Sequence, residues 1–189
     1  MIQVIDFETF SKIDIRSAGA YRYASDPSTE ALCLCFIEKD DPSEDPYLWL
    51  PGDDYPFDDG DYRFAAHNAE FEMFIWTFVM TRLYGWPECP PPEKLIDTAA
   101  IARYRGYPGK LENAAEAMLL KYKKNMEGHR IMLKLSKPRK PSKHNPATRW
   151  TKEAVPEDYE KLYDYCADDV LPEREIIRLW GELPAREQR

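Results

Sequence analysis

The first ten residues of the chain, MIQVIDFETF (1–10), contain the feature on which the fold prediction rests. Residues 2–7 are mostly apolar, which predicts a short buried strand. Asp6 and Glu8 stand at its end, two positions apart, so their carboxylates project to the same side. Two neighbouring carboxylates repel each other unless a cation lies between them. Because Thr9 follows directly on an apolar strand, we favour a functional strand end over two unrelated surface acids.

Further strands are predicted downstream at 31–37 (ALCLCFI), 47–50 and, more briefly, 64–66. The connections between the first three strands are short and rich in turn residues, so we expect antiparallel pairing there. Residues 95–98 fit either a strand or the entry to a helix. The remaining segments with helical spacing are 67–84 (with Asn68 near its start as a cap), 99–104, 111–122 and 158–180, the last kinked at Pro172. Strands followed by helices predict an α/β fold with a mixed sheet flanked by helices, in one domain over 1–189.

Charge is distributed unevenly along the chain, whose formal net charge is −8. Residues 38–61 hold ten acids and one lysine, which we interpret as a solvated face. Residues 121–152 hold eleven Lys and Arg against one Glu and include a Pro-rich basic loop at 136–150. Such a segment suits a polyanion, and nucleic acid is favoured. The candidate phosphate contacts are Arg130, Lys134, Lys137, Arg139 and Lys140.

Several classes of protein are excluded by the composition. The longest apolar stretch, about 71–80, is shorter than the ~20 residues that cross a bilayer, and no basic segment precedes an apolar one at the start. The four cysteines lack paired metal-ligand spacing and only three histidines are present. We therefore expect a cytoplasmic protein with reduced thiols, no zinc, no secretory signal and no membrane partner.

Two more segments carry polar residues at helical spacing. Asn68 and Glu72 in NAEFE are four positions apart, as are Tyr165 and Asp169 in YCADD, and residues at that spacing share one face of a helix. The other polar residues of these segments are expected to play no chemical part: Glu70 and Asp168 as solvated acids, and Cys166 as a small buried residue.

Taken in order, the three patterns DxE, NxxxE and YxxxD resemble the motifs of the DEDDy group of 3′–5′ exonucleases. The chain is most similar to the proofreading domain of family A DNA polymerases, particularly phage versions. The segments that carry this resemblance span nearly the whole chain: DFET, GAYRYASDPSTEALCL, AHNAEFE, IDTA, EGHRIMLKLSKPRK and DYCADDV. The resemblance implies a ribonuclease H-like fold and a metal-dependent 3′–5′ exonuclease that shortens single-stranded DNA.

The same resemblance assigns roles to five side chains around two divalent cations, Mg²⁺ or Mn²⁺. Asp6 would bridge both ions, Glu8 and Asp169 would complete the site on the nucleophile side, and Tyr165 would orient the attacking water. Glu72 would serve the leaving-group side, where the family usually has aspartate; glutamate keeps the charge and reaches one methylene further. All four acids offer the oxygen ligands that hard cations prefer.

Substrate contacts are expected beside these acids. Asn68 and Thr9 would hold the terminal nucleotide, and Phe10 would either stack beside its base or pack in the core. The expected partners are the 3′ end of single-stranded DNA and a polymerase domain in cis or trans, in the host cytoplasm if the protein is phage-encoded. Two alternatives stay open: an exoribonuclease of the ribonuclease D type, and a catalytically silent nucleic-acid-binding module. The sequence does not separate a standalone enzyme from an excised polymerase domain.

Overall fold

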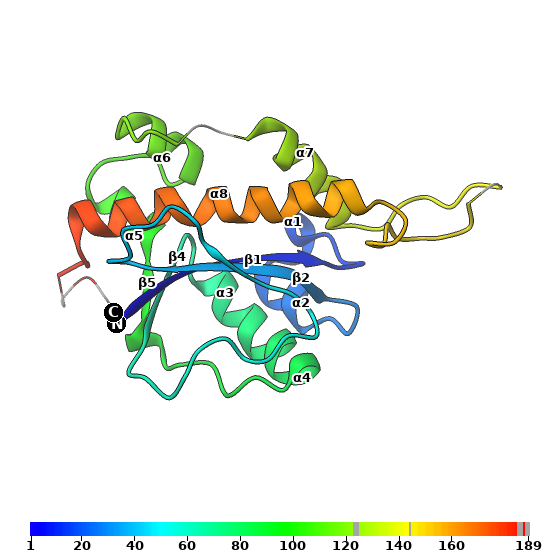
Figure 1. Ribbon diagram of the computed structural model, residues 1–189, viewed down its shortest axis with the longest axis horizontal. Helices are drawn as coiled ribbons and strands as arrows, with labels where there is room; N and C mark the ends of the chain where they lie inside the picture. Colours follow the sequence, from blue (N-terminus) through cyan, green and yellow to red (C-terminus); the bar gives the residue numbers. More distant parts are fainter. Residues whose placement is uncertain (123–124, 144, 185–186, 188–189) are drawn as a thin grey trace.

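The computed structural model describes residues 1–122, 125–143, 145–184 and 187. Within these ranges the strands form a five-stranded sheet in the order β3-β2-β1-β4-β5 (Figure 1). Their bounds are β1 Ile2–Phe10, β2 Glu30–Glu38, β3 Tyr47–Trp49, β4 Arg63–Ala66 and β5 Leu95–Asp97. β1 pairs antiparallel with β2 and parallel with β4, β2 pairs antiparallel with β3, and β4 pairs parallel with β5. The expected mixed sheet in an α/β fold is therefore confirmed.

Helices cover both faces of the sheet (Figure 1). One face is covered by the long helix α8 (Pro156–Trp180), with α6 (Leu111–Ala117) and α7 (Met126–Leu135) beyond it. The other face is covered by a segment that runs from α3 through a π-helical turn into α4. The remaining bounds are α1 Ile15–Ala18, α2 Ala20–Ser25, α3 Glu70–Ile75, η1 Trp76–Met80, α4 Thr81–Tyr84, η2 Pro92–Lys94 and α5 Thr98–Tyr104.

The alternation of side chains along β1 gives each face of the sheet its own apolar core. Val4 and Phe10 belong to the cluster that includes the buried side of α8, whereas Ile5 and Phe7 belong to the cluster with Trp76 of η1. Asp6 and Glu8 lie between Val4 and Phe10 in the alternation, so they face α8. The two acids therefore interrupt an otherwise apolar interface.

The segment predicted as one helix over 67–84 begins later than expected. The α-helix starts at Glu70, and Asn68 precedes it in the left-handed region with φ 65°. The predicted cap at Asn68 is wrong: the N-cap position is Ala69, which makes no side-chain capping bond. Asparagine adopts positive φ more readily than most residues, because its short polar side chain bonds locally.

The region after residue 111 also differs from the prediction. The helix expected over 111–122 ends at Ala117, and Leu119 follows with φ 57° and a 90% exposed side chain. Helix α7 was not predicted, because its residues were interpreted only as part of the basic segment at 121–152. Its buried residues, Gly128, Ile131 and Leu135, follow the helical spacing that packs it on α8. α8 runs through Pro172 as one continuous α-helix, and the kink expected at Pro172 stays a prediction.

The basic loop contains no helix or strand between residues 137 and 150 in its described part, as expected; His144 lies outside the described residues. Among the described helices, none is both long enough and apolar enough to cross a bilayer.

Candidate active site

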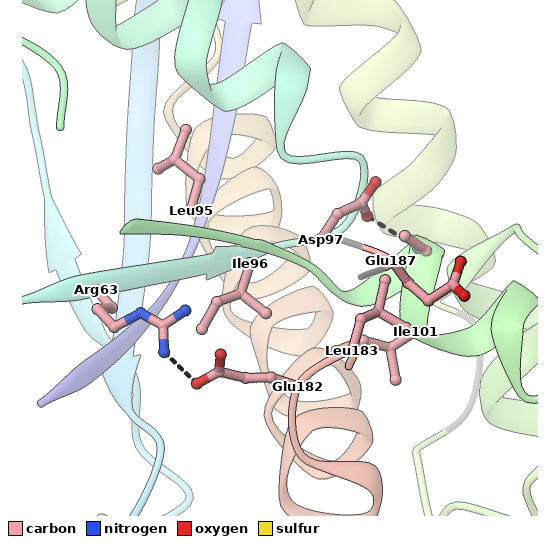
Figure 2. A pocket seen from close by; sticks show the side chains of 9 residues that line it. Arg63, Leu95, Ile96, Asp97, Ile101, Glu182, Leu183 and Glu187 are labelled. Carbon is pink, nitrogen blue, oxygen red and sulfur yellow. Dashed lines mark hydrogen bonds and ion pairs between the residues drawn. The ribbon is translucent and has the colours of Figure 1, made fainter. Parts of the chain in front are cut away.

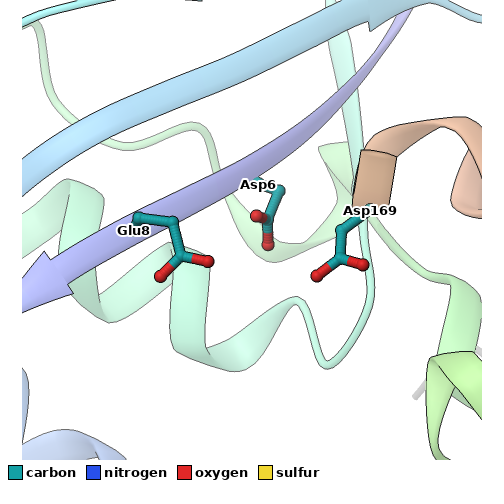
Figure 3. A group of neighbouring side chains, drawn as sticks. All are labelled: Asp6, Glu8 and Asp169. Atoms are coloured by element: carbon teal, nitrogen blue, oxygen red, sulfur yellow. The ribbon is translucent and has the colours of Figure 1, made fainter. Parts of the chain in front are cut away.

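Three carboxylates from opposite ends of the chain meet between the sheet and α8. Asp6 and Glu8 extend from β1 and Asp169 extends from α8 toward them (Figure 3). Each offers one carboxylate oxygen, and these oxygens all lie within 4.8 Å of one another. The β-strand alternation at Asp6 and Glu8 and the burial of one side of α8 together produce this convergence.

Glu72 lies near Asp6, but its carboxylate is not one of the three whose oxygens lie within 4.8 Å of one another. β4 pairs only with Ile2–Val4, so no described strand covers this edge of β1 from Ile5 onward. The first turn of α3 follows β4 at this point and carries Glu72, whose side chain is 5% exposed. The charge of Asp6 acts on Glu72, which places the two carboxylates near each other. Glu70, two positions earlier, is exposed as predicted.

Burial and mutual repulsion make ionisation of these acids unfavourable. Desolvation raises the pKa of Asp6 to about 6, although a hydrogen bond from Cys166 opposes the shift. Desolvation, followed by the charges of neighbouring acids, holds the pKa of Glu8 and of Asp169 well above their ordinary values. The same causes raise the pKa of Glu72. The cluster therefore needs protons or a cation to be stable.

Tyr165 lies one helical turn before Asp169 and donates a hydrogen bond to its carboxylate. Desolvation and the negative charges of Asp169, Glu8 and Asp6 raise the pKa of this phenol far above its ordinary range. The hydroxyl therefore keeps its proton at neutral pH and acts as a hydrogen-bonding group. Next along α8, Cys166 is buried as predicted, and its thiol donates to the backbone carbonyl of Asp6 at 3.2 Å.

One buried acid was missed in the sequence. Glu173 follows Asp169 by one turn of α8 and is 1% exposed. Desolvation raises its pKa first, followed by the charges of Asp6, Glu72 and Asp169. In PEREIIRLW it resembles any acid on the solvated side of a helix, and only the position of α8 on the sheet identifies it as buried. The helical spacing of 169 and 173 was the available signal.

The donor atoms of the cluster fit hard divalent cations. All are carboxylate oxygens, which Mg²⁺ and Mn²⁺ prefer. Asp6 Oδ2 and Glu72 Oε2 are buried and have no hydrogen-bond partner. Buried oxygens without partners are costly, and a bound cation would compensate that cost. Asp6, Glu8, Glu72 and Asp169 could therefore hold such ions.

A groove of about 700 Å³ opens beside Glu8. Its wall includes Thr9, which is buried and shares a 2.9 Å hydrogen bond with the hydroxyl of Tyr23. The register of β1 and β2 shifts between Glu8 and Thr9, and bulges of this kind re-aim side chains near functional sites. Besides Glu8, the acid Asp14 lines the groove, and the Lys, Arg and His side chains that line it are Lys12, Arg16, His129 and Lys137. Of these, only Lys137 was predicted, because the others lie outside the basic run or are not Lys or Arg.

The structure places the other expected substrate residues differently. Phe10 is 4% exposed, and the guanidinium of Arg149 lies 4.3 Å from its ring centroid, which favours the core-packing interpretation. Asn68 is exposed, and its backbone N–H donates to Asp97 Oδ1 at 3.0 Å. The helical face that Asn68 was expected to share with Glu72 does not exist, because Asn68 precedes the helix.

The five predicted phosphate contacts divide into two groups. Lys134 and Arg139 lie over the ring of Trp150, at 4.6 and 4.2 Å from its centroid, and Lys134 also pairs with Asp158. These two cations therefore have partners within the protein. The exposed members of the set are Arg130, Lys137 and Lys140.

A second cavity, of about 190 Å³, shares no lining residue with the group of Asp6, Glu8 and Asp169 (Figure 2). It is lined by β5 residues, α5 and the segment after α8, and the ion pair of Arg63 with Glu182 stands at its wall. Asp97 also lines it, but this carboxylate accepts the N–H groups of Ala99 and Ala100 as the cap of α5. Among the described residues, the acids that line it do not form a group with oxygens within 4.8 Å of one another, as Asp6, Glu8 and Asp169 do.

The chain is similar to one characterised protein over most of its length. It is 33% identical over 181 residues to a protein named DNA polymerase from Bacillus phage SP02, an alignment that includes 91% of this chain. The chain spans 26% of the length of that polymerase. No protein-family model matches the chain.

Proposed function

We propose that this chain is a 3′–5′ exonuclease that removes nucleotides from the 3′ end of single-stranded DNA and proofreads for a DNA polymerase. The observation that carries the proposal is the convergence of Asp6, Glu8 and Asp169 within 4.8 Å, beside a groove. Carboxylates so close together fit a centre for divalent cations better than a structural role, because without cations they repel one another. The resemblance of the motifs to DEDDy exonucleases supports the same assignment.

The four acids would be shared between two divalent cations. Asp6, Glu8 and Asp169 would hold one cation, and Asp6 with Glu72 would hold the other. Bound there, divalent cations would lower the pKa of water and neutralise charge on the phosphodiester as it is cleaved. The chain itself supplies the low-dielectric surroundings, since Glu8 and Glu72 are 8% and 5% exposed.

Tyr165 is suited to orient the attacking water and unsuited to deprotonate it. Its raised pKa means that the phenolic proton stays on Oη at neutral pH. The hydrogen bond to Asp169 fixes the direction of the hydroxyl next to the cluster. A positioned donor of this kind lowers the entropic part of the barrier without accepting a proton.

The groove beside Glu8 fits the 3′-terminal nucleotides. Thr9, Phe71 and Lys137 all line it, so sugar, base and phosphate would each meet a matching side chain. Contacts of this type tolerate any base, as a proofreader requires. The similarity to a phage DNA polymerase favours DNA as the substrate and a polymerase as the partner.

The test is digestion of 5′-labelled single-stranded DNA with Mg²⁺, with Mn²⁺ and with EDTA. We expect a ladder that shortens from the 3′ end only when metal is present, and none from Asp6→Asn. A matched RNA strand distinguishes the ribonuclease D alternative, in which RNA would be the better substrate. Absence of metal-dependent cleavage of either strand, with binding retained, would support the silent-module alternative.

A further inference from the structure

Glu173 is a further buried acid on the helix that carries Asp169. It stands one helical turn beyond Asp169 on α8 and is 1% exposed. Its carboxylate accepts the backbone N–H of His67, at the carboxyl end of β4. The helix that follows β4 carries Glu72, and the charges of Glu72 and Asp6 both act on Glu173.

One oxygen of Glu173 has no partner. Among the described residues, the buried carboxylate oxygens without a hydrogen-bond partner belong to three side chains: Asp6 Oδ2, Glu72 Oε2 and Glu173 Oε2. Leaving a buried polar group unpaired destabilises the fold, and each such group in a native structure calls for an explanation such as a bound ion.

Within the described part of the chain, no ion pair joins Glu173 to a cation, and the nearby Arg178 pairs with Glu175 instead. The charged groups that act on it are Asp6, Glu72 and Asp169, which are all acidic. The adjacent Arg174 is equally buried, but its guanidinium donates to the carbonyls of Asp41 and Ser43, at 3.1 and 2.6 Å. If residue 173 had only a structural role, an apolar side chain would stabilise the folded state more than glutamate does. Replacing an unpaired buried charge by a neutral group of similar shape is usually stabilising.

We infer that Glu173 is a fifth carboxylate of the metal centre, and that it holds the second cation together with Glu72. The inference rests on the proposed function, because it assigns a further residue to the same centre. Asp6, Glu8 and Asp169 then form one half of the centre, and Glu72 and Glu173 provide the additional oxygens of the other half. Glu72 stands where the family usually has aspartate, and Glu173 would add a second carboxylate to that half of the centre.

The experiment is a titration with Mn²⁺ that counts bound ions by electron paramagnetic resonance, without nucleic acid. We expect two ions on the wild type. Glu173→Gln should keep one ion at nearly unchanged affinity and weaken the second by at least ~10-fold, equivalent to about 1.4 kcal/mol. Glu72→Gln should affect the same ion. Glu160→Gln, an exposed acid of the same helix, is the matched control and should change neither ion.

Melting in EDTA separates a metal role from a structural one. Removing a repelled buried charge should leave the melting temperature of Glu173→Gln equal to or above that of the wild type, while the increment from Mn²⁺ shrinks. Unchanged binding of both ions, or a variant that no longer folds in EDTA, would overturn the inference and make Glu173 a structural partner of His67. A wild type that binds no Mn²⁺ would instead refute the proposed function.

Discussion

Gly128 of α7 lies directly against Tyr165 of α8. A Cβ built on Gly128 would come within 2.7 Å of both Cβ and Cδ2 of Tyr165, closer than real side chains approach. The contact explains a glycine in the interior of a helix, where it ordinarily weakens the helix. α7 therefore contacts the candidate active site at this position, as it also does where His129 faces the ring of Tyr165.

Gly128→Ala should therefore lower activity by displacing Tyr165. In an open helix the change stabilises by about 0.5–1 kcal/mol, but overpacking here should cost about 1–3 kcal/mol. A shift of the phenol by about 1 Å would reduce kcat on the order of 10²-fold. Single-turnover digestion of labelled DNA measures the loss.

The double variant with Tyr165→Phe shows whether the effect passes through the hydroxyl. Tyr165→Phe keeps the ring and removes only Oη. If Gly128→Ala acts by moving that hydroxyl, adding it to Tyr165→Phe should lower kcat little further. Fully additive losses in kcat would show that Gly128 acts on the site by another route.

The acids of the site predict how stability depends on pH without metal. Asp6 has a pKa of about 6 in the folded protein against 3.8 ordinarily. Because the folded state binds this proton more tightly, the stability it contributes is fully present below the ordinary pKa and is lost as the pH rises through 6. The raised pKa values of Glu8, Glu72, Asp169 and Glu173 extend that loss upward.

We therefore expect the melting temperature in EDTA to fall as the pH rises from 3.8 through about 6, and to go on falling above that. Mn²⁺ should raise it most at the alkaline end, where the carboxylates are ionised and cation binding displaces few protons. Asp6→Asn should flatten the pH dependence and reduce the Mn²⁺ increment. Equal stabilisation of Asp6→Asn and wild type by Mn²⁺ would contradict a role for Asp6 in holding the ions.

Local patterns in the sequence were enough to predict much of the site. Asp6 and Glu8 share a side because a strand alternates with period two, and Tyr165 and Asp169 share a face because a helix repeats every 3.6 residues. Local patterns do not contain the information that places Glu173. Its burial depends on how α8 lies on the sheet, and the sequence around it alternates charged and apolar residues as an exposed helix would.

Asn68 and the basic run show two further limits. The positive φ of Asn68 is held by the bond from its N–H to Asp97, a residue 29 positions away. The cations over Trp150 are likewise held by a tertiary contact, so charge density alone overestimated how many of them face solvent. In both cases a contact with a residue far along the chain decides the conformation, and the local sequence does not show that contact.

The basic loop gives a prediction about binding. Lys137 and Lys140 are exposed, and Lys137 lines the groove, so neutralising both should weaken binding to single-stranded DNA. Each lost phosphate contact should reduce the slope of log affinity against log salt by about 0.7. Fluorescence anisotropy over a range of salt concentrations measures this, with Mg²⁺ omitted to prevent cleavage.

Two comparisons make that experiment specific. Neutralising Lys39 and Lys94, which pair with Asp40 and Asp61 of the acidic run, matches the change in net charge and should leave the slope nearly unaltered. Arg139→Gln should instead lower thermal stability, because its guanidinium covers Trp150. An unchanged slope for the Lys137 and Lys140 variant would identify the loop as a solvated segment without a role in binding.

Glu72 provides the sharpest test of the metal centre, because its charge and its length can be varied separately. Glu72→Gln keeps the shape of a 5% exposed side chain and removes its charge, whereas Glu72→Asp keeps the charge and shortens the arm. If the carboxylate supports a cation, Gln should lose activity on the order of 10²-fold, which is about 2.7 kcal/mol, and recover part of it at high metal concentration. Asp should stay within roughly 10-fold of wild type and favour Mn²⁺ over Mg²⁺, since Mg²⁺ tolerates distorted octahedral geometry poorly.

Glu70→Gln removes the same charge from the exposed side of the same helical turn and should change activity by less than about 2-fold. Steady-state digestion across a metal titration checks all three variants, and an indispensable Glu70 beside a dispensable Glu72 would show that the wrong acid of this turn has been assigned to the centre.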